Sequence, residues 1–186
     1  MKTKHISHAI MLFSMVATSS LAYAQNTSAE KPKMEEAKTV QAGSLTATIA
    51  DSVSFSTLTK ALKAAELDIT LGTKGDYTIF APTDEAFSKL PSGVLTSLLL
   101  PENKQKLRSV MLYHVVAGRM LAADLQNGDV KTMNGEKVKI DVGSDKIEVD
   151  GAKVFSADVS ATNGVMHTIG VVLVPKTLDG FAGLKK

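Results

Sequence analysis

Helical spacing dominates the first half of the folded region. Apolar side chains recur three and four positions apart, the period of one helix face, at Phe55, Leu58, Leu62 and Ala65. This spacing predicts a helix over residues 55–65. Two further helices are predicted over residues 93–99 and 102–111, because Pro101 separates two segments of helix-forming residues.

A strand followed by a capped helix is predicted in the middle of this half. Residues 77–81 are β-branched and aromatic, which favours a strand, and Pro82 ends it. Thr83 is placed to cap a short helix, because its hydroxyl can accept a hydrogen bond from a free amide of the first turn. Asp84 and Glu85 follow within that turn, where the helix dipole favours negative charge.

Strand alternation dominates the second half. Between residues 136 and 142 the apolar positions Val138, Ile140 and Val142 alternate with the polar positions Lys137, Lys139 and Asp141. Asn134–Gly135 and Asp150–Gly151 favour tight hairpin turns, so we expect an antiparallel meander with one solvent-exposed face. The continuous apolar run 171–174 predicts a central strand. Helices followed by strands indicate the α+β class.

The N-terminus has the pattern of an export signal. Lys2 and Lys4 precede an apolar stretch over residues 9–21, and small residues close the segment at Ala24. This order is typical of a secretory signal peptide, predicted over residues 1–24 and cleaved after Ala24. We therefore expect a secreted protein, periplasmic or extracellular, with no transmembrane segment after cleavage.

The composition of the rest of the chain predicts its domain organisation and excludes some kinds of site and partner. Residues 25–42 are polar and predict a flexible leader, and residues 43–184 form one expected domain.

After Ala24 the chain holds 19 basic and 19 acidic residues, so its net charge is zero. No basic stripe with interleaved aromatics occurs, so no nucleic-acid partner is expected. The chain has no cysteine, which excludes disulfides, thiolate metal sites and a cysteine nucleophile.

Three segments of the sequence resemble one known family. They are YTIFAPTDEAF over residues 77–87, LYHVVAG over 112–118 and NGVMHTIGVVLVP over 163–175. Together they are similar to the motifs of the fasciclin (FAS1) domain. The resemblance implies a compact β-sandwich or wedge of about seven strands, with several helices packed along one edge. The third segment departs from the family at Gly170, where an acidic or polar residue is common.

Two histidines follow the predicted signal peptide, and each lies in one of these segments. Strand alternation through residues 112–116 would place His114 among apolar neighbours, which is typical of a buried, hydrogen-bonded histidine. Because the family brings the segments close, we hypothesise that Thr83 or Asp84 is its partner. His167 follows a predicted turn at 163–164 and is likewise expected to be structural.

Adhesion is the function that the resemblance implies. In animal members of the family the Tyr-His segment has been implicated in adhesion, which makes Tyr113 and His114 candidate partner-binding residues. The expected partner is a cell surface, a matrix or another protein, and the oligomeric state is left open. A different possibility is a carrier of a hydrophobic small molecule, carotenoid- or lipid-like. Its groove would be lined by Leu98, Met111, Met120 and Met133.

Chemical catalysis is not expected. The sequence contains no G-x-S-x-G nucleophile elbow and no phosphate-binding glycine loop. His114 and His167 lie 53 positions apart and do not form a metal-ligand pattern. We therefore predict a non-enzymatic protein with no catalytic residue, no metal and no cofactor.

Overall fold

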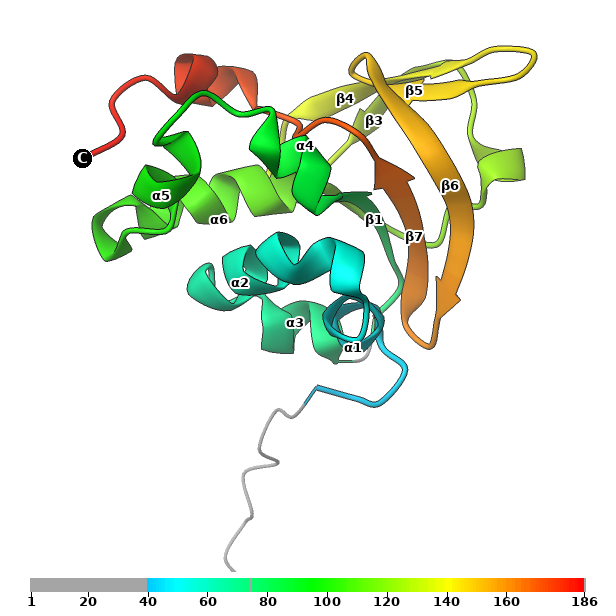
Figure 1. Cartoon of the computed structure of the whole chain (residues 1–186). Helices are drawn as coiled ribbons and strands as arrows, with labels where there is room; N and C mark the ends of the chain where they lie inside the picture. The colour runs from blue at the N-terminus through cyan, green and yellow to red at the C-terminus, as the bar shows by residue number, and fades with distance from the viewer. Residues whose placement is uncertain (1–39, 74, 186) are drawn as a thin grey trace, which may run out of the picture. The chain divides into compact units, whose positions relative to one another are not determined.

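The computed structural model describes residues 40–73 and 75–185, and helices come first in the chain (Figure 1). The helical elements before the second strand are α1 (Leu45–Ala50), η1 (Val53–Phe55), α2 (Ser56–Ala64), α3 (Asp68–Gly72), α4 (Asp84–Ser88), α5 (Val94–Leu98), η2 (Pro101–Asn103) and α6 (Lys104–Tyr113). The predicted helices over 55–65, 93–99 and 102–111 are thus confirmed to within a few residues. The predicted signal peptide (1–24) and leader residues 25–39 lie outside the described residues.

Seven strands form one sheet. They are β1 (Tyr77–Pro82), β2 (Val115–Ala117), β3 (Gly128–Lys131), β4 (Lys137–Val142), β5 (Ile147–Val149), β6 (Ala152–Ala161) and β7 (Gly164–Ile169), with the short helices η3 (Ala122–Asp124) and η4 (Lys176–Phe181) outside it. The order is β2-β1-β7-β6-β5-β4-β3, and β1 and β7 pair in parallel while the other pairs are antiparallel. A bridge between Val116 and Thr132 joins the two ends of this order, so the sheet curls toward a barrel.

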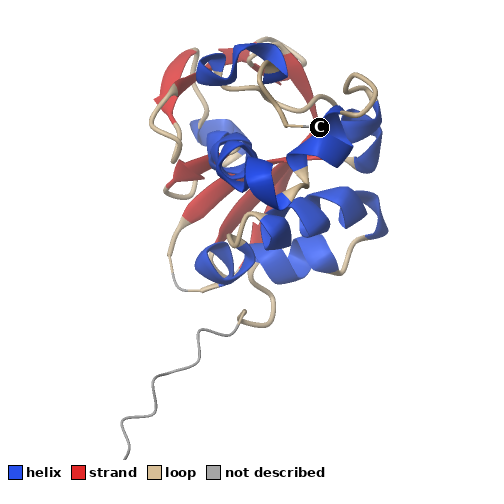
Figure 2. Ribbon diagram, turned by 90° about the vertical axis from the view of Figure 1, so that its left-hand side faces the viewer, coloured by secondary structure: helices blue, strands red, loops and turns tan. Residues whose placement is uncertain are grey.

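The helices gather on one side of β1 and β7, as the two views show (Figures 1 and 2). Strand β1 separates two hydrophobic cores, because successive side chains of a strand point to opposite faces. Ile79 and Ala81 pack against the helices, whereas Phe80 packs inside the curled sheet with Val138 and Ile140. Within the described part of the chain, no helix has the length and apolar character needed to span a membrane.

The two predicted hairpin turns are confirmed, and glycine in each adopts the positive φ angle that the turn requires. Asp150 and Gly151 join β5 to β6 with φ values of 47° and 77°, as a tight hairpin turn demands. Gly135 has a φ of 95° and lies in the turn between β3 and β4. The chemistry of these dipeptides therefore fixes the register of the meander.

Two predicted strands are wrong. Leu112 and Tyr113 belong to α6, and β2 begins only at Val115, because the helical apolar spacing of α6 continues through this segment. The run 171–174 continues beyond β7 without strand pairing. In that run the Leu173 amide donates to a histidine ring instead of to a neighbouring strand.

Candidate functional site

Thr83 and Asp84 cap two different helices. The Thr83 Oγ1 accepts a hydrogen bond from the Ala86 amide at 3.3 Å, so the capping prediction for α4 is confirmed. The Asp84 Oδ1 accepts a hydrogen bond from the Thr57 amide at 2.7 Å, in the first turn of α2. Asp84 therefore fastens the start of α2 to the start of α4.

His114 is buried, but its hypothesised partners are wrong. The ring lies at the C-cap of α6, where Nδ1 donates to the Val110 carbonyl at 2.8 Å and Nε2 accepts from the Leu173 amide at 2.9 Å. Neither Thr83 nor Asp84 contributes, because the helical backbone turns the ring over its own last turn. Burial lowers the pKa of His114 to about 4, and the bond to Val110 offsets this shift in part.

Tyr113 is also buried, with 1% of its surface exposed. Its hydroxyl donates to the Asp150 carboxylate at 2.5 Å and lies 3.1 Å from the Lys137 carbonyl. Burial raises the pKa of Tyr113, and the bond to Asp150 raises it further. Tyr113 thus joins the end of α6 to the β5–β6 turn. Its partner-binding role, like that of His114, stays a prediction.

His167 lies in β7 between the two strands that flank it. Its Nε2 is 2.8 Å from the Met120 carbonyl, and its Nδ1 accepts from the Asp158 amide at 3.4 Å. The ring stacks on Phe80 with centroids 5.7 Å apart and planes at 27°. Four elements of the curled sheet and its loops therefore meet at this side chain.

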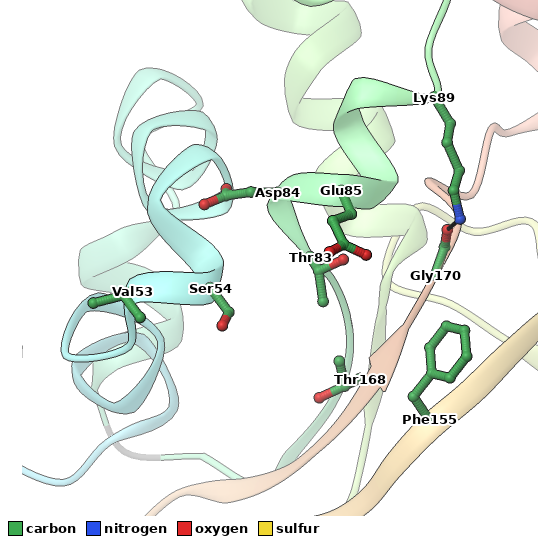
Figure 3. Close-up of a pocket in the computed structure, with 9 residues that line it drawn as sticks. All are labelled: Val53, Ser54, Thr83, Asp84, Glu85, Lys89, Phe155, Thr168 and Gly170. Atoms are coloured by element: carbon green, nitrogen blue, oxygen red, sulfur yellow. Dashed lines mark hydrogen bonds between the residues drawn. The ribbon is translucent and has the colours of Figure 1, made fainter.

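A groove that sequence reasoning did not find lies between α4 and β6 (Figure 3). We call it the α4–β6 groove, and its volume is about 480 Å³. It is lined by Val53, Ser54, Thr83, Asp84, Glu85, Lys89, Phe155, Thr168 and Gly170. Figure 3 shows η1 on one side, β6 on the other and the end of β7 between them.

Two exposed apolar side chains stand on opposite sides of the α4–β6 groove. Val53 is 89% exposed at the start of η1, and Phe155 is 64% exposed on β6. Phe155 lies at a register irregularity of the β6–β7 pair, where the ladder shifts between Val154 and Ser156. Large apolar side chains exposed around one hollow are typical of interaction sites.

The Phe155 ring explains the departure at Gly170. A Cβ at position 170 would come within 2.2 Å of the ring, so the ring occupies the space that a side chain there would need. The Lys89 Nζ donates to the Gly170 carbonyl at 2.8 Å. Glycine at this position thus allows an aromatic side chain from β6 to cover the end of β7.

The groove carries more acidic than basic charge. Asp84 and Glu85 line it, and neither takes part in an ion pair within residues 40–73 and 75–185. Its cation, Lys89, is already bound to the Gly170 carbonyl. The site can therefore offer carboxylates and hydroxyls to donors on a ligand, beside apolar contacts at Val53 and Phe155.

Comparison with known proteins agrees with the motifs and the fold. A sequence model of the Fasciclin domain matches residues 53–175. Protein sll1483 of Synechocystis sp. is 45% identical over 142 residues, which are 76% of this chain and 79% of that protein. The chain belongs to the fasciclin family. Transforming growth factor-beta-induced protein ig-h3 of Sus scrofa is 38% identical over 122 residues, 65% of this chain but 18% of that protein.

The fold is that of known fasciclin domains. A FAS1 domain pair from the insect cell adhesion molecule Fasciclin I superposes with a TM-score of 0.63 at 18% identity. The match covers 72% of this chain and 51% of that chain. The expected fold class, α+β with seven strands and helices along one edge, is therefore confirmed.

The lipophilic groove expected in this fasciclin domain is not formed by the residues named for it. Leu98 and Met111 are buried in the core beside the helices, whereas Met120 packs against the core inside the sheet. Met133 is 43% exposed. The alternative of one shared methionine-lined groove is contradicted, because Leu98 and Met111 lie in one core, Met120 packs against the other, and Met133 belongs to neither.

The groove residues carried a weak signal in the sequence. Phe155 follows Lys153 and Val154 in a strand whose alternation turns it toward solvent, and Val53 stands between two serines. Neither pattern shows that η1 and β6 come together, because they are about 100 residues apart. Among the described residues, no three acidic or histidine side chains are grouped as a metal site requires.

Proposed function

We propose that this fasciclin domain is an exported, non-enzymatic binding module that takes its partner in the α4–β6 groove. The observation that supports this most directly is the pair Val53 and Phe155, which expose 89% and 64% of their surface on opposite sides of one hollow. Exposed apolar side chains grouped around a concave surface are a feature of interaction sites. The predicted signal peptide supports export.

Adhesion is the biological role that we infer for this module. The insect Fasciclin I is described as a cell adhesion molecule, and its domain pair shares the fold. An adhesive partner would be a surface, a matrix or a protein. At the groove it would place apolar groups on Val53 and Phe155, and hydrogen-bond donors or a cation near Asp84 and Glu85.

Tyr113 and His114 enter this proposal as supports of the fold. Both are 1% exposed, so a partner cannot contact them without rearrangement. Substituting either one would change adhesion by destabilising α6 and the β5–β6 turn. The groove residues offer a cleaner test, because they are exposed.

The test is adsorption of the labelled protein to intact cells and extracellular material of the producing organism. We expect Val53→Ser combined with Phe155→Ser to weaken adsorption about ten-fold or more, since two contact residues are lost. Ile69→Ser is the matched control, because Ile69 is 42% exposed on α3 and does not line the groove. Equal adsorption of the double variant and the control would refute the groove as the binding site.

A further inference from the structure

The last described residues form a strap over the helical side of the domain. This C-terminal strap, residues 176–185, begins just after the region matched by the fasciclin family, which ends at residue 175. In Figure 1 it is the red segment near α5. Leu178, Phe181 and Leu184 recur every third position and pack, partly buried, against the helical core.

A buried amide holds the far end of the strap by its backbone. Asn103 is 2% exposed, and its Nδ2 donates to the Ser97 carbonyl at 2.7 Å and to the Lys185 carbonyl at 2.9 Å. Its Oδ1 accepts from the Lys185 amide at 3.1 Å. Pairing with both backbone groups of Lys185 holds the chain at that residue whatever side chain it carries.

A second anchor holds the near end. The Glu136 carboxylate accepts from the Lys176 amide at 3.0 Å and from the Thr177 hydroxyl at 2.6 Å. Lys106 also donates to the Gly183 carbonyl. The strap is therefore attached by polar contacts at its ends and by three apolar side chains between them.

The strap does not fill the surface that it covers. An open groove of about 750 Å³ remains beside it, which we call the α5 groove. It is lined by Ser92, Gly93, Val94, Thr96, Ser97, Leu100, Phe181, Gly183 and Leu184. Leu100 ends the apolar SLLL run, which begins within α5. Unfilled apolar surface means that a better-fitting segment would gain contacts that the strap does not make.

The strap also adopts an unfavourable backbone. Asp179 and Phe181 have φ values of 44° and 72°, in the left-handed region that residues other than glycine seldom occupy. Such strain persists only where surrounding contacts hold it. The strap is thus bound by local contacts against its own conformational preference, which favours exchange with another segment.

We propose that the α5 groove, together with Asn103, is a docking site for a peptide segment of a partner protein. The segment carries large apolar side chains three positions apart, as Leu178, Phe181 and Leu184 do in the strap. In the free protein the C-terminal strap occupies part of this site and is displaced on binding. The site shares no lining residue with the α4–β6 groove, so it is independent of the function proposed above.

The test uses the full chain and a fluorescent peptide with the strap sequence KTLDGFAGLKK. Phe181→Ser combined with Leu184→Ser in the full chain removes two of the three apolar anchors of the strap and leaves Asn103 and residues 92–100 intact. The tethered strap competes at a high effective concentration, so we expect the variant to bind the peptide at least about ten-fold more tightly than the wild type. The control peptide KTSDGSAGSKK should bind neither chain. Equal binding of the strap peptide to both chains, or binding to neither, overturns the proposal.

Hydrogen exchange of the unmodified chain provides a second test that needs no substitution. Excess unlabelled strap peptide should speed exchange at the Lys185 amide, which loses its bond to Asn103. Exchange within residues 92–103 should stay close to that of the free chain, because the peptide replaces the cover that the strap gave. Unchanged exchange at the Lys185 amide overturns the proposal, whatever the stability of the double variant.

Discussion

At the scale of single residues, His114 links the end of α6 to the segment that follows β7. Its neutral ring donates from Nδ1 and accepts at Nε2, so the bond from the Leu173 amide needs the uncharged form. Protonation of Nε2 would remove the acceptor for the Leu173 amide and place a charge in a buried site. The folded state is therefore stable only while the His114 Nε2 carries no proton.

This dependence predicts acid destabilisation in a defined range. Burial lowers the folded-state pKa of His114 to about 4, from an unfolded value of 6.5. Between these values only the unfolded chain takes up the proton, so stability is full above pH 6.5 and falls as the pH drops toward 4. The loss from this group is about 3 kcal/mol in the free energy of unfolding.

Urea titrations at several pH values between 7 and 4 measure this slope. His114→Gln removes the titrating group, so its free energy of unfolding should depend less steeply on pH over the same range. An equally steep slope in the variant would show that other groups cause the acid sensitivity. If the variant does not fold, NMR titration of the wild-type ring decides the point, because a ring that titrates near 6.5 contradicts the expectation.

At the scale of elements, the short helices are fastened by side chains from other elements. Helices α2 and α4 have only nine and five residues, too few to be stable alone. Asp84 joins their starting turns through its bond to the Thr57 amide. Capping between elements therefore replaces the stability that longer helices would derive from their own hydrogen bonds.

Asp84→Ala should lower the free energy of unfolding by about 1–2 kcal/mol, the usual cost of losing a capping acceptor. Glu85→Ala is the matched control, since Glu85 lies in the same first turn of α4 but is exposed. We expect that control to cost a few tenths of a kcal/mol, because it loses only the interaction with the helix dipole. Urea midpoints of the two variants give the comparison, and equal losses would contradict the capping role.

The same scale shows what the sequence could predict. The spacing of apolar residues and the turn-forming dipeptides predicted the positions of α2, β1, α4 and the β5–β6 turn, because each of these signals lies within a few residues. They did not place the Asn163 side chain, which accepts from the Leu45 amide and donates to the Leu71 and Thr73 carbonyls. These partners lie about 90 to 118 positions away, so no local pattern reveals them.

The local sequence pattern also predicted a strand at residues 112–113, which belong to helix α6. An apolar helix end and a buried strand have the same pattern over a few positions. The candidate site was missed for a related reason. Val53 and Phe155 become parts of one groove only in the folded chain, where η1 and β6 lie on opposite sides of the same hollow. The fasciclin motifs predicted the fold and include part of the groove lining, but neither Val53 nor Phe155 lies in them.

At the scale of the whole molecule, the exposed pair proposed for binding is separate from the buried Tyr113 that stabilises the fold. Tyr113 is enclosed between α6 and the β5–β6 turn, so Tyr113→Ala opens a cavity and removes the hydroxyl that donates to the Asp150 Oδ2, leaving that carboxylate only its bond from the Lys139 amide. Truncations of large buried aromatic side chains cost about 3–5 kcal/mol. Phe155→Ser changes a side chain that is 64% exposed, and we expect it to cost about 1 kcal/mol or less.

Measuring melting and adsorption on both variants separates the two surfaces. Tyr113→Ala should lower the melting temperature by many degrees, yet adsorb normally per folded molecule at a temperature where it is still native. Phe155→Ser should melt close to the wild type and lose adsorption, because the groove loses one of its two apolar contacts. The opposite result would be normal adsorption by Phe155→Ser and loss of adsorption by folded Tyr113→Ala. It would assign the adhesive role to the Tyr-His segment. Such a result would require α6 to release Tyr113 on binding, since the hydroxyl is otherwise held by Asp150.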